Sequence, residues 1–386
     1  MTGKPAVLGG TPLLSTPLPM TRPTLVNQLG IMDRIRAVLA SGTLTGGPTV
    51  TEFEHQVARY LQVEDVVAVN SCTSGLMLVL RCLGRTGDVL LPSFTFMASG
   101  HAVVWNGLRP CFADVAPDTF TLDPRVILDS SDADPVAILG VHTFGMPADA
   151  DELAKVAAAQ GAELIFDAAH GLGGRYPDGT RIGGKGLAEV FSLSPTKPLT
   201  TAEGGLVSTN DRSLAAELRH ARNYGNPGDY DSRLIGLNAR MTEISAAMGL
   251  CALPELDAIL DRRRALASRY ANGLAGLPLA VQRIPDGCTP VYKDFTILVD
   301  PHQFGIDRDR LAHTLAAEGV STRSYFSPPL HRQTAYAGCD PADLPVTDAI
   351  ADQCLTLPLY SHMPESSVDM VIEAITRAYD HREELA

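Results

Sequence analysis

A regular alternation of short apolar segments and helical segments, which begins at residue 66, constrains the fold of this chain more than any other feature. The pattern predicts strands at residues 66–69, 88–91, 110–115, 136–141 and 163–167, with helices at 76–82 and about 150–160. Strands joined by helices of this length form right-handed βαβ units, so we expect an α/β fold with a mainly parallel sheet. Ligands of such sheets bind beyond the carboxyl ends of the strands.

The rest of the chain predicts an N-terminal arm and a second, smaller domain. The 386 residues are too many for one ordinary core. Pro, Gly and Thr are frequent in residues 1–28, which we interpret as an extended arm, and residues 29–41 have helical spacing. A helix at 241–250 and a long mixed stretch at 253–274 lead to strands at 294–299 and 321–325 and helices at 308–318 and 365–379. We therefore expect the arm and a large domain in residues 1–250 and a small α/β domain in residues 251–386.

One helix start carries a recognisable signal. Thr49 and Glu52 have the spacing of a capping box, in which the hydroxyl of the first residue and the carboxylate of the second satisfy free backbone N–H groups. The apolar residues that follow share one helical face: Phe53, Val57, Tyr60 and Leu61. The sequence therefore predicts that Thr49 caps a helix.

Composition and charge exclude several classes of protein. Hydrophobic residues make up 45% of the chain and charged residues 19%, as in a globular protein. The net charge of −13, without a basic run, argues against a nucleic-acid-binding surface. Seven scattered cysteines without a C-x-x-C pair indicate reduced thiols and no zinc or other metal site. No apolar run has the length of a membrane span or of a signal-peptide core, so we expect a cytoplasmic protein.

A single lysine, Lys197, lies in a loop rich in Ser, Thr and Gly between two segments of strand character. The stretch reads FSLSPTKPLTTAEGGLVSTND from Phe191 to Asp211. Lysine forms Schiff bases with carbonyl groups, and burial among apolar neighbours lowers its pKa toward the working range. Lys197 is thus a candidate amine nucleophile, and an ordinary loop lysine is the alternative interpretation.

Two further motifs follow predicted strands directly. The segment 70–75, NSCTSG, opens a helix, so its free backbone N–H groups and the hydroxyls of Thr73 and Ser74 could hold a phosphate. A simple helix cap is the alternative interpretation and, for this motif alone, the more common one. Asp167, in IFDAAH, ends a buried strand and needs a partner, which a protonated ring nitrogen would provide. A structural cap of the next turn is the alternative there.

Aromatic and polar residues complete the candidate set. Phe96, in PSFTF, could stack on a planar cofactor or belong to the core. The segments 223–225 (NYG) and 236–243 (GLNARMTE) contain Tyr224 and Arg240 and either form a routine loop and cap or bind a phosphate or carboxylate. An amine nucleophile, a carboxylate for a ring nitrogen, a stacking aromatic and a phosphate cradle are together the requirements of pyridoxal 5'-phosphate (PLP).

The motifs in their order resemble the DegT/DnrJ/EryC1/StrS family of PLP-dependent sugar aminotransferases over nearly the whole chain. The similar segments are GGPTVTEFE, NSCTSGL, LPSFTF, FDAAHGLG, FSLSPTK with EGGLVSTND, NYG, GLNARMTEISAAMGL and SYFSPPLH. The resemblance implies the aspartate-aminotransferase-like fold, fold type I. Within the family the chain is most similar to enzymes that aminate C4 of a dTDP-4-keto-6-deoxyhexose, of the desosamine and calicheamicin pathways.

The resemblance also implies roles for individual residues. Lys197 corresponds to the Schiff-base lysine, Asp167 to the partner of the pyridine nitrogen, and His170 to a residue beside the ring hydroxyl. The remaining cofactor contacts implied are Phe96, Thr73, Ser74, Ser192 and, from a partner subunit, Asn238. The implied substrate contacts are Tyr224, Arg240, Tyr325 and His331. Cys72 replaces a small residue of many relatives.

The resemblance implies a homodimer with shared sites that transfers an amino group from L-glutamate to C4 of dTDP-4-keto-6-deoxy-D-glucose in aminosugar and antibiotic biosynthesis. Amination at C3 of a dTDP-3-keto-6-deoxyhexose, amination of a keto-cyclitol and a PLP-dependent dehydratase or epimerase stay open as alternatives. Some relatives that have become dehydratases carry histidine in place of the lysine, whereas this chain keeps Lys197. A PLP-binding regulator is a further alternative, but the acidic chain lacks the basic DNA-binding segment that such a protein needs.

Overall fold

The computed structural model describes residues 3–129, 135–339 and 343–386, and its centre is a seven-stranded sheet with the order β1-β7-β6-β5-β4-β2-β3. The strands are β1 (Asp65–Val69), β2 (Asp88–Pro92), β3 (Arg109–Ala113), β4 (Ala137–Val141), β5 (Glu163–Asp167), β6 (Ala188–Ser192) and β7 (Gly205–Thr209). The strands from β3 to β6 are parallel, whereas β7 runs antiparallel to both β6 and β1. The predicted mainly parallel α/β sheet is confirmed.

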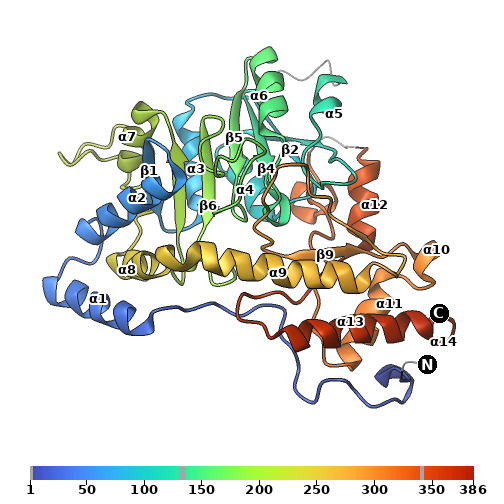
Figure 1. The fold of residues 1–386 in the computed structure, drawn as a ribbon. Helices are drawn as coiled ribbons and strands as arrows, with labels where there is room; N and C mark the ends of the chain where they lie inside the picture. The colour runs from blue at the N-terminus through green and yellow to red at the C-terminus, as the bar shows by residue number, and fades with distance from the viewer. Residues whose placement is uncertain (1–2, 130–134, 340–342) are drawn as a thin grey trace.

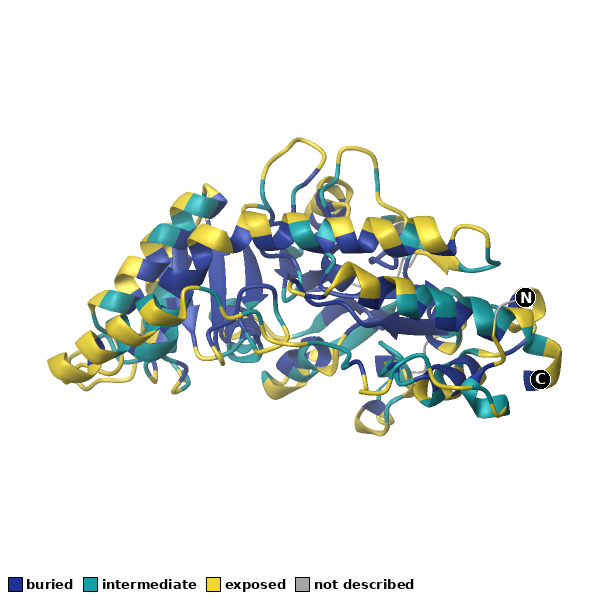
Figure 2. Ribbon diagram, turned by 60° about the horizontal axis from the view of Figure 1, so that its bottom comes forward, coloured by how far each residue is buried: buried dark blue, intermediate teal, exposed yellow. Residues whose placement is uncertain are grey.

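Helices cover both faces of this sheet, as Figure 1 shows. On one face the buried side chains come from α2 (Pro48–Leu61), α6 (Ala150–Ala159) and α8 (Glu243–Ala252). On the other face they come from α3 (Cys72–Cys82), α4 (Met97–Trp105) and α7 (Arg212–Ala221). Successive strand residues alternate between the two cores, since Val66 and Ala68 face the first and Val67 and Val69 the second. The strands are accordingly dark in Figure 2, between helices whose outer faces are exposed.

A second, three-stranded sheet has its own core. It consists of β8 (Ala280–Val281), β9 (Phe295–Leu298) and β10 (Cys354–Leu357), all antiparallel. Its helices are α10 (Pro301–Phe304), α11 (Arg308–Ala317), α12 (Pro345–Gln353), α13 (Glu365–Asp380) and α14 (Arg382–Leu385). In α13, Val368, Val371 and Ile375 are fully buried, at the spacing of one helical face.

The long helix α9 (Leu256–Leu274) connects the two cores. Leu256 and Leu260 belong to the core of the large sheet, whereas Leu266 and Tyr270 belong to that of the small one. The N-terminal arm, with η1 (Ala6–Leu8), packs through Leu18 on the core of the small sheet. The remaining helices are α1 (Gln28–Ser41) and α5 (Pro124–Asp129). The division at residue 250 stays a prediction. None of the helices in the described ranges combines the length and apolar character that a bilayer span requires.

Two predictions about local structure are wrong. Helix α2 begins at Pro48 with Gly47 as its cap, so Thr49 does not cap it. The carboxylate of Glu243, buried on α8, accepts the backbone N–H groups of Gly47, Thr49 and Val50 at 2.8–3.1 Å instead. A side chain from nearly 200 residues away thus satisfies the free backbone N–H groups at the start of α2, in place of the predicted cap by Thr49.

The predicted strand at 321–325 is absent from the described residues. Only Arg323 pairs there, in an isolated bridge with Thr356 of β10. The two backbone hydrogen bonds of this bridge are 3.2 and 2.7 Å long, and the chain then turns at Tyr325 toward the large sheet. Residues 321–325 therefore belong to a loop.

Candidate active site

The ends of four strands meet at one edge of the large sheet. Val69 pairs with Gly205, Ser192 pairs with the same glycine, and Asp167 pairs with Val190 next to the end of β6. Because β7 is antiparallel, its first residue lies at the edge where β1, β5 and β6 end. The topology therefore brings the loops that follow these strands to one place.

A cavity of about 300 Å³ opens at this edge. The residues predicted from the sequence that line it are Thr73, Phe96, Asp167, His170, Ser192, Lys197 and Tyr325. This volume is within the range of small-molecule sites. The structure thus brings together the predicted amine, carboxylate, stacking aromatic and part of the phosphate cradle.

Lys197 lies in the turn after β6 and is partly buried. Its backbone N–H donates to the carbonyl of Ser194 (3.0 Å), while Thr201 N–H donates to the carbonyl of Leu193 (3.0 Å) at the base of the loop. Burial, followed by the positive charge of Lys293, lowers the pKa of Lys197 from 10.5 to about 7. A substantial fraction of the amine is therefore neutral at neutral pH, as a nucleophile requires.

Asp167, at the end of β5, is 5% exposed and its carboxylate is held from two sides. Ser99 Oγ donates to Oδ2 (2.6 Å), and the backbone N–H of Ala169 donates to Oδ1 (3.0 Å). The thiol of Cys72 lies 3.9 Å from Oδ1. These contacts fix the orientation of a carboxylate that lines the cavity and leave it able to accept a further donor.

His170 lines the same cavity, three residues after Asp167. Burial, followed by the positive charges of Lys197 and Lys293, holds the pKa of its imidazole well below 6.5. The ring is therefore neutral near pH 7, so it can donate or accept a hydrogen bond there without contributing charge.

The N-terminus of α3 forms the cradle predicted for a phosphate. Ser71 caps the helix, and its hydroxyl accepts from Ser74 N–H at 3.1 Å. Ser71, Cys72 and Thr73 line the cavity. Gly205 lies against this turn so closely that a Cβ there would be 2.5 Å from the carbonyl carbon of Ser71. The backbone of β7 can support the cradle only because residue 205 has no side chain.

Five predicted site residues lie outside the lining of this cavity: Ser74, Tyr224, Asn238, Arg240 and His331. Asn238 is exposed, and its carbonyl accepts from Asn70 Nδ2 at 3.2 Å. Arg240 donates to Asn223 Oδ1 and lies over the ring of Tyr224 at 5.5 Å. His331 Nδ1 is 2.7 Å from Ser93 Oγ, and its Nε2 is 3.1 Å from Asp348 Oδ1.

Sequence reasoning missed a buried ion pair in the cavity. Lys293 Nζ contacts both carboxylate oxygens of Asp294, at 2.8 and 3.0 Å, and the residues are 6% and 5% exposed. Both line the cavity, with Phe326, although they immediately precede β9 of the small sheet. A charged pair directly before a buried strand was the only available signal, and it does not indicate which cavity the pair will reach.

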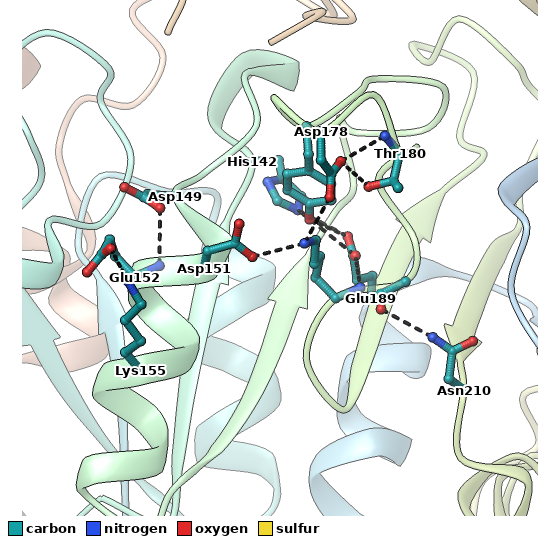
Figure 3. Close-up of polar contacts among 12 residues, drawn as sticks. His142, Asp149, Asp151, Glu152, Lys155, Asp178, Thr180, Glu189 and Asn210 are labelled. Carbon is teal, nitrogen blue, oxygen red and sulfur yellow. Dashed lines mark hydrogen bonds and ion pairs between the residues drawn. The ribbon is translucent and has the colours of Figure 1, made fainter. Parts of the chain in front are cut away.

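A second buried network, of which Figure 3 shows His142 and Glu189, holds the sheet next to the site. The backbone N–H of His142 donates to the carbonyl of Asp167 (3.1 Å), and the His142 ring stacks on Phe166 with centroids 4.8 Å apart. His142 Nε2 is 3.2 Å from Glu189 Oε2, and Tyr176 OH donates to the same carboxylate. These contacts connect the end of β4 to β5 and β6 and thereby fix the backbone that carries Asp167.

The residues of the cavity fit PLP. Lys197 supplies an amine of lowered pKa, Asp167 an oriented carboxylate, and the start of α3 backbone N–H groups with a glycine-supported turn behind them. Phe96, 49% exposed, offers a ring face at the cavity. The donor set therefore matches the aldehyde, ring nitrogen, phosphate and ring plane of this cofactor.

Comparison with known proteins agrees with this chemistry. The chain is 37% identical to dTDP-3-amino-3,4,6-trideoxy-alpha-D-glucose transaminase of Streptomyces venezuelae over 88% of its length and 90% of that protein. It is 29% identical to dTDP-4-amino-4,6-dideoxy-D-glucose transaminase of Escherichia coli, over 91% of this chain and 96% of that protein. A crystal structure of DesI with its TDP-sugar product superimposes with a TM-score of 0.93 at 38% identity, covering 98% of this chain and 97% of that one.

The family model for DegT/DnrJ/EryC1/StrS aminotransferases matches residues 28–376. This match and the solved relatives confirm the fold predicted from the sequence, fold type I, and the cofactor PLP. The chain therefore belongs to the DegT/DnrJ/EryC1/StrS aminotransferase family and is a PLP-dependent aminotransferase.

Proposed function

We propose that this enzyme transfers the amino group of L-glutamate to a dTDP-linked keto-deoxyhexose, at C4 of dTDP-4-keto-6-deoxy-D-glucose. The observation that carries the proposal is the juxtaposition of Lys197 and Asp167 in one cavity at the sheet edge. The names of the relatives support a dTDP-sugar as the acceptor. Position C4 rests on the similarity of the sequence motifs and on the E. coli relative.

Amination at C3 is the second candidate, because the S. venezuelae relative at 37% identity is named for a 3-amino sugar. The two positions predict different products from different keto sugars. Each acceptor would be incubated with the enzyme and L-glutamate, and the position of the new amine would be read from the NMR spectrum of the product. A product aminated only at C3 would overturn the C4 assignment.

PLP, when bound, supplies an aldehyde carbon to which amines bond and a ring that withdraws electrons from that carbon. Lys197 would hold the cofactor through its amine, and once free its neutral Nζ would accept the proton that leaves the α-carbon of the amino acid. The pKa of about 7 suits both directions of this proton transfer near neutral pH.

Asp167 and the start of α3 hold the cofactor. The carboxylate of Asp167, oriented by Ser99 and Ala169, would keep a proton on the ring nitrogen and stabilise the positive charge there. The N–H groups near Thr73 would bind the phosphate, and Ser192 lies at the end of the neighbouring strand. Phe96 would offer its ring for stacking, and neutral His170 would offer a hydrogen bond.

We also propose a homodimer in which Asn238 of one subunit completes the site of the other. Asn238 is exposed and lies outside the cavity of its own subunit. Large apolar side chains are exposed on α1 and on the segment before Asn238: Leu29 is 84% exposed and Ile235 76%. Surfaces of this kind occur where a partner binds.

The experiment that tests the function separates the two halves of the reaction. The PLP-loaded enzyme is mixed with L-glutamate, freed of small molecules and then mixed with dTDP-4-keto-6-deoxy-D-glucose, while the absorbance of the bound cofactor is followed. We expect the absorbance to change with glutamate and to return with the sugar. A change without return would discard this acceptor, and no change with glutamate would discard the donor.

A further inference from the structure

Apart from the effect of the Lys293 charge on the pKa values of Lys197 and His170, the buried pair of Lys293 and Asp294 has no role in the chemistry described so far. It lines the same cavity as Lys197 but comes from the segment that precedes β9 of the small sheet. Burying an ammonium and a carboxylate is costly, and apolar residues of similar size are often as stable in such a place. A charged pair kept beside a reactive amine therefore points to a ligand.

The position of the Lys293 backbone is fixed by several contacts. Its N–H donates to the carbonyl of Phe144 (2.9 Å), in the loop after β4, and its own carbonyl accepts from Arg263 Nη2 (2.7 Å). Arg263, 2% exposed, also donates from Nε to the carbonyl of Tyr292 (2.8 Å). These bonds hold Lys293 at the cavity before any ligand arrives, so little ordering is needed on binding.

The cavity contains only one cation that is not the reacting amine, among the described residues that line it. Its basic side chains are Lys197, Lys293 and His170, and the pKa of His170 is held well below 6.5. The ammonium of Lys293 has three N–H groups, of which at least one is free after its two contacts with Asp294. Among these lining residues, Lys293 is therefore the cation available to bind an anionic group that enters the cavity.

The chemistry of the two substrates identifies that anion. In an amino acid the α-carboxylate is bonded to the carbon that carries the reacting amine, so it must lie close to Lys197. In a nucleotide sugar the charged diphosphate is separated from the reacting carbon by the hexose ring. Lys293 is close enough to Lys197 for its charge to contribute to the lowered pKa of that amine. A cation so near the reacting centre suits the carboxylate and not the diphosphate.

We infer that Lys293 binds the α-carboxylate of the amino donor and that Asp294 holds the Lys293 ammonium in position. This inference rests on the aminotransferase function proposed above and adds the site for the donor. Asp294 neutralises Lys293 when no donor is bound, and the ring of Tyr325, 5.8 Å from Nζ, limits its movement. The keto sugar has no α-carboxylate and does not use this site.

The two half-reactions distinguish this role from a structural one. We expect Lys293→Met to lower kcat/KM for L-glutamate in the donor half-reaction by about 10- to 100-fold, the effect of losing one hydrogen bond to a charged group. Both half-reactions are compared at about pH 9, where the Lys197 amine is mostly neutral with or without the nearby charge. There the acceptor half-reaction, started from aminated enzyme and the keto sugar, should change less than about twofold. An equal loss in both half-reactions, or no loss in either, would overturn the inference.

Three companion variants control for folding and for charge. Lys293→Arg keeps the charge and should retain most of the glutamate reaction. Asp294→Asn keeps the lysine but removes the carboxylate that holds its ammonium, so the donor reaction should fall by less than it does in Lys293→Met. Lys293→Met combined with Asp294→Asn avoids an unpaired buried carboxylate and should show the same donor defect as the single lysine variant. Full donor activity in that double variant would contradict the inference.

A binding measurement supplies a readout that does not depend on turnover. Glutarate has carboxylates but no amine, so it can occupy the site without reacting. Titration calorimetry with the PLP-loaded enzyme should give a Kd at least about tenfold weaker in Lys293→Met than in the parent. Equal affinities would count against Lys293. Because this titration and the donor half-reaction need no sugar, failure of the proposed acceptor would be recognised separately.

Discussion

Ser99 Oγ donates a 2.6 Å hydrogen bond to Oδ2 of Asp167, and neither residue is more than 5% exposed. Ser99 lies on α4 and Asp167 ends β5, so a helix on the face of the sheet orients the carboxylate at its edge. The hydroxyl of Thr95, 2.9 Å from Ser99 Oγ, completes a short chain of hydroxyl groups. One oxygen of the Asp167 carboxylate is therefore oriented by a residue that does not line the cavity, while Ala169 in the lining holds the other.

Removing this hydroxyl should slow the reaction more than it weakens folding. We expect Ser99→Ala to reduce the single-turnover rate with L-glutamate by about tenfold, because the carboxylate loses a charge-assisted hydrogen bond. Ser99→Thr should restore part of the rate. Thr95→Val, which removes a hydroxyl without direct contact to Asp167, is the matched control. Equal effects of the Thr95 and Ser99 variants would show that the contact with Asp167 is unimportant.

The amine of Lys197 should lose its proton, and so become reactive, as the pH rises through about 7. Its ordinary pKa is 10.5, and burial with the charge of Lys293 lowers it. The rate at which added PLP becomes bound to cofactor-free enzyme should therefore rise through about pH 7. Lys293→Met should move this midpoint upward, because a nearby positive charge is lost, and Asp294→Asn should move it downward. A midpoint near 10 in the parent enzyme would refute the assignment.

Lys197 should also lower the stability of the cofactor-free protein. Its pKa of about 7 in the folded state is below the 10.5 of an unfolded chain, so between these values the unfolded chain holds more protons. The cost is fully present below pH 7 and disappears as the pH rises toward 10.5. Lys197→Met should raise Tm by about 1–3 °C at pH 6.5 and by less at pH 9.5.

The measurement is a thermal melt of both proteins at the two pH values, without cofactor. Lys155→Met is the control, because the Lys155 side chain is 70% exposed and is bonded to a carboxylate of its own helix. That substitution should leave Tm nearly unchanged at both values. A lower Tm for Lys197→Met at pH 6.5 would show that burial of the charged amine does not destabilise the folded protein.

A methyl group at Gly205 should disrupt the phosphate cradle. The added Cβ would lie 2.5 Å from the carbonyl carbon of Ser71 and 2.6 Å from the backbone nitrogen of Cys72. We expect Gly205→Ala to weaken PLP binding by at least about tenfold, measured by fluorescence titration, because the start of α3 must move. Gly276→Ala, where no atom lies within 4 Å of the added Cβ, is the control. Unchanged affinity for PLP in Gly205→Ala would show that this turn does not bind the cofactor.

Mixed dimers test whether Asn238 acts across subunits. Lys197→Ala and Asn238→Ala enzymes should each have little activity. Because the two defects of a mixed dimer, one from each subunit, would fall in the same site, the other site would be intact, and refolded mixtures should regain up to about a quarter of the parent activity. No recovery, with dimers shown by sedimentation, would place Asn238 in its own subunit's site.

The elements that sequence predicts well are those set by local pattern. The alternation of apolar strands and helices indicated the parallel sheet, and Lys197, Asp167 and Thr73 lie in the cavity because strand ends share an edge. Two contacts depended on tertiary structure instead. Glu243 caps α2 from another helix, and Lys293 reaches the cavity from beside the small sheet. Local sequence patterns cannot predict either contact, because each depends on how distant segments pack.

The pairing of Ser192 with Gly205 has a consequence for the entropy of catalysis. Both ends of the loop that carries Lys197 are anchored in adjacent antiparallel strands, so the loop is closed at its base by the sheet itself. The cost of closing it is met when the protein folds and not when the cofactor or a substrate binds. The amine therefore starts each turnover from a restricted set of positions, and insertions between these two residues should be tolerated far less well than insertions in loops at the opposite edge.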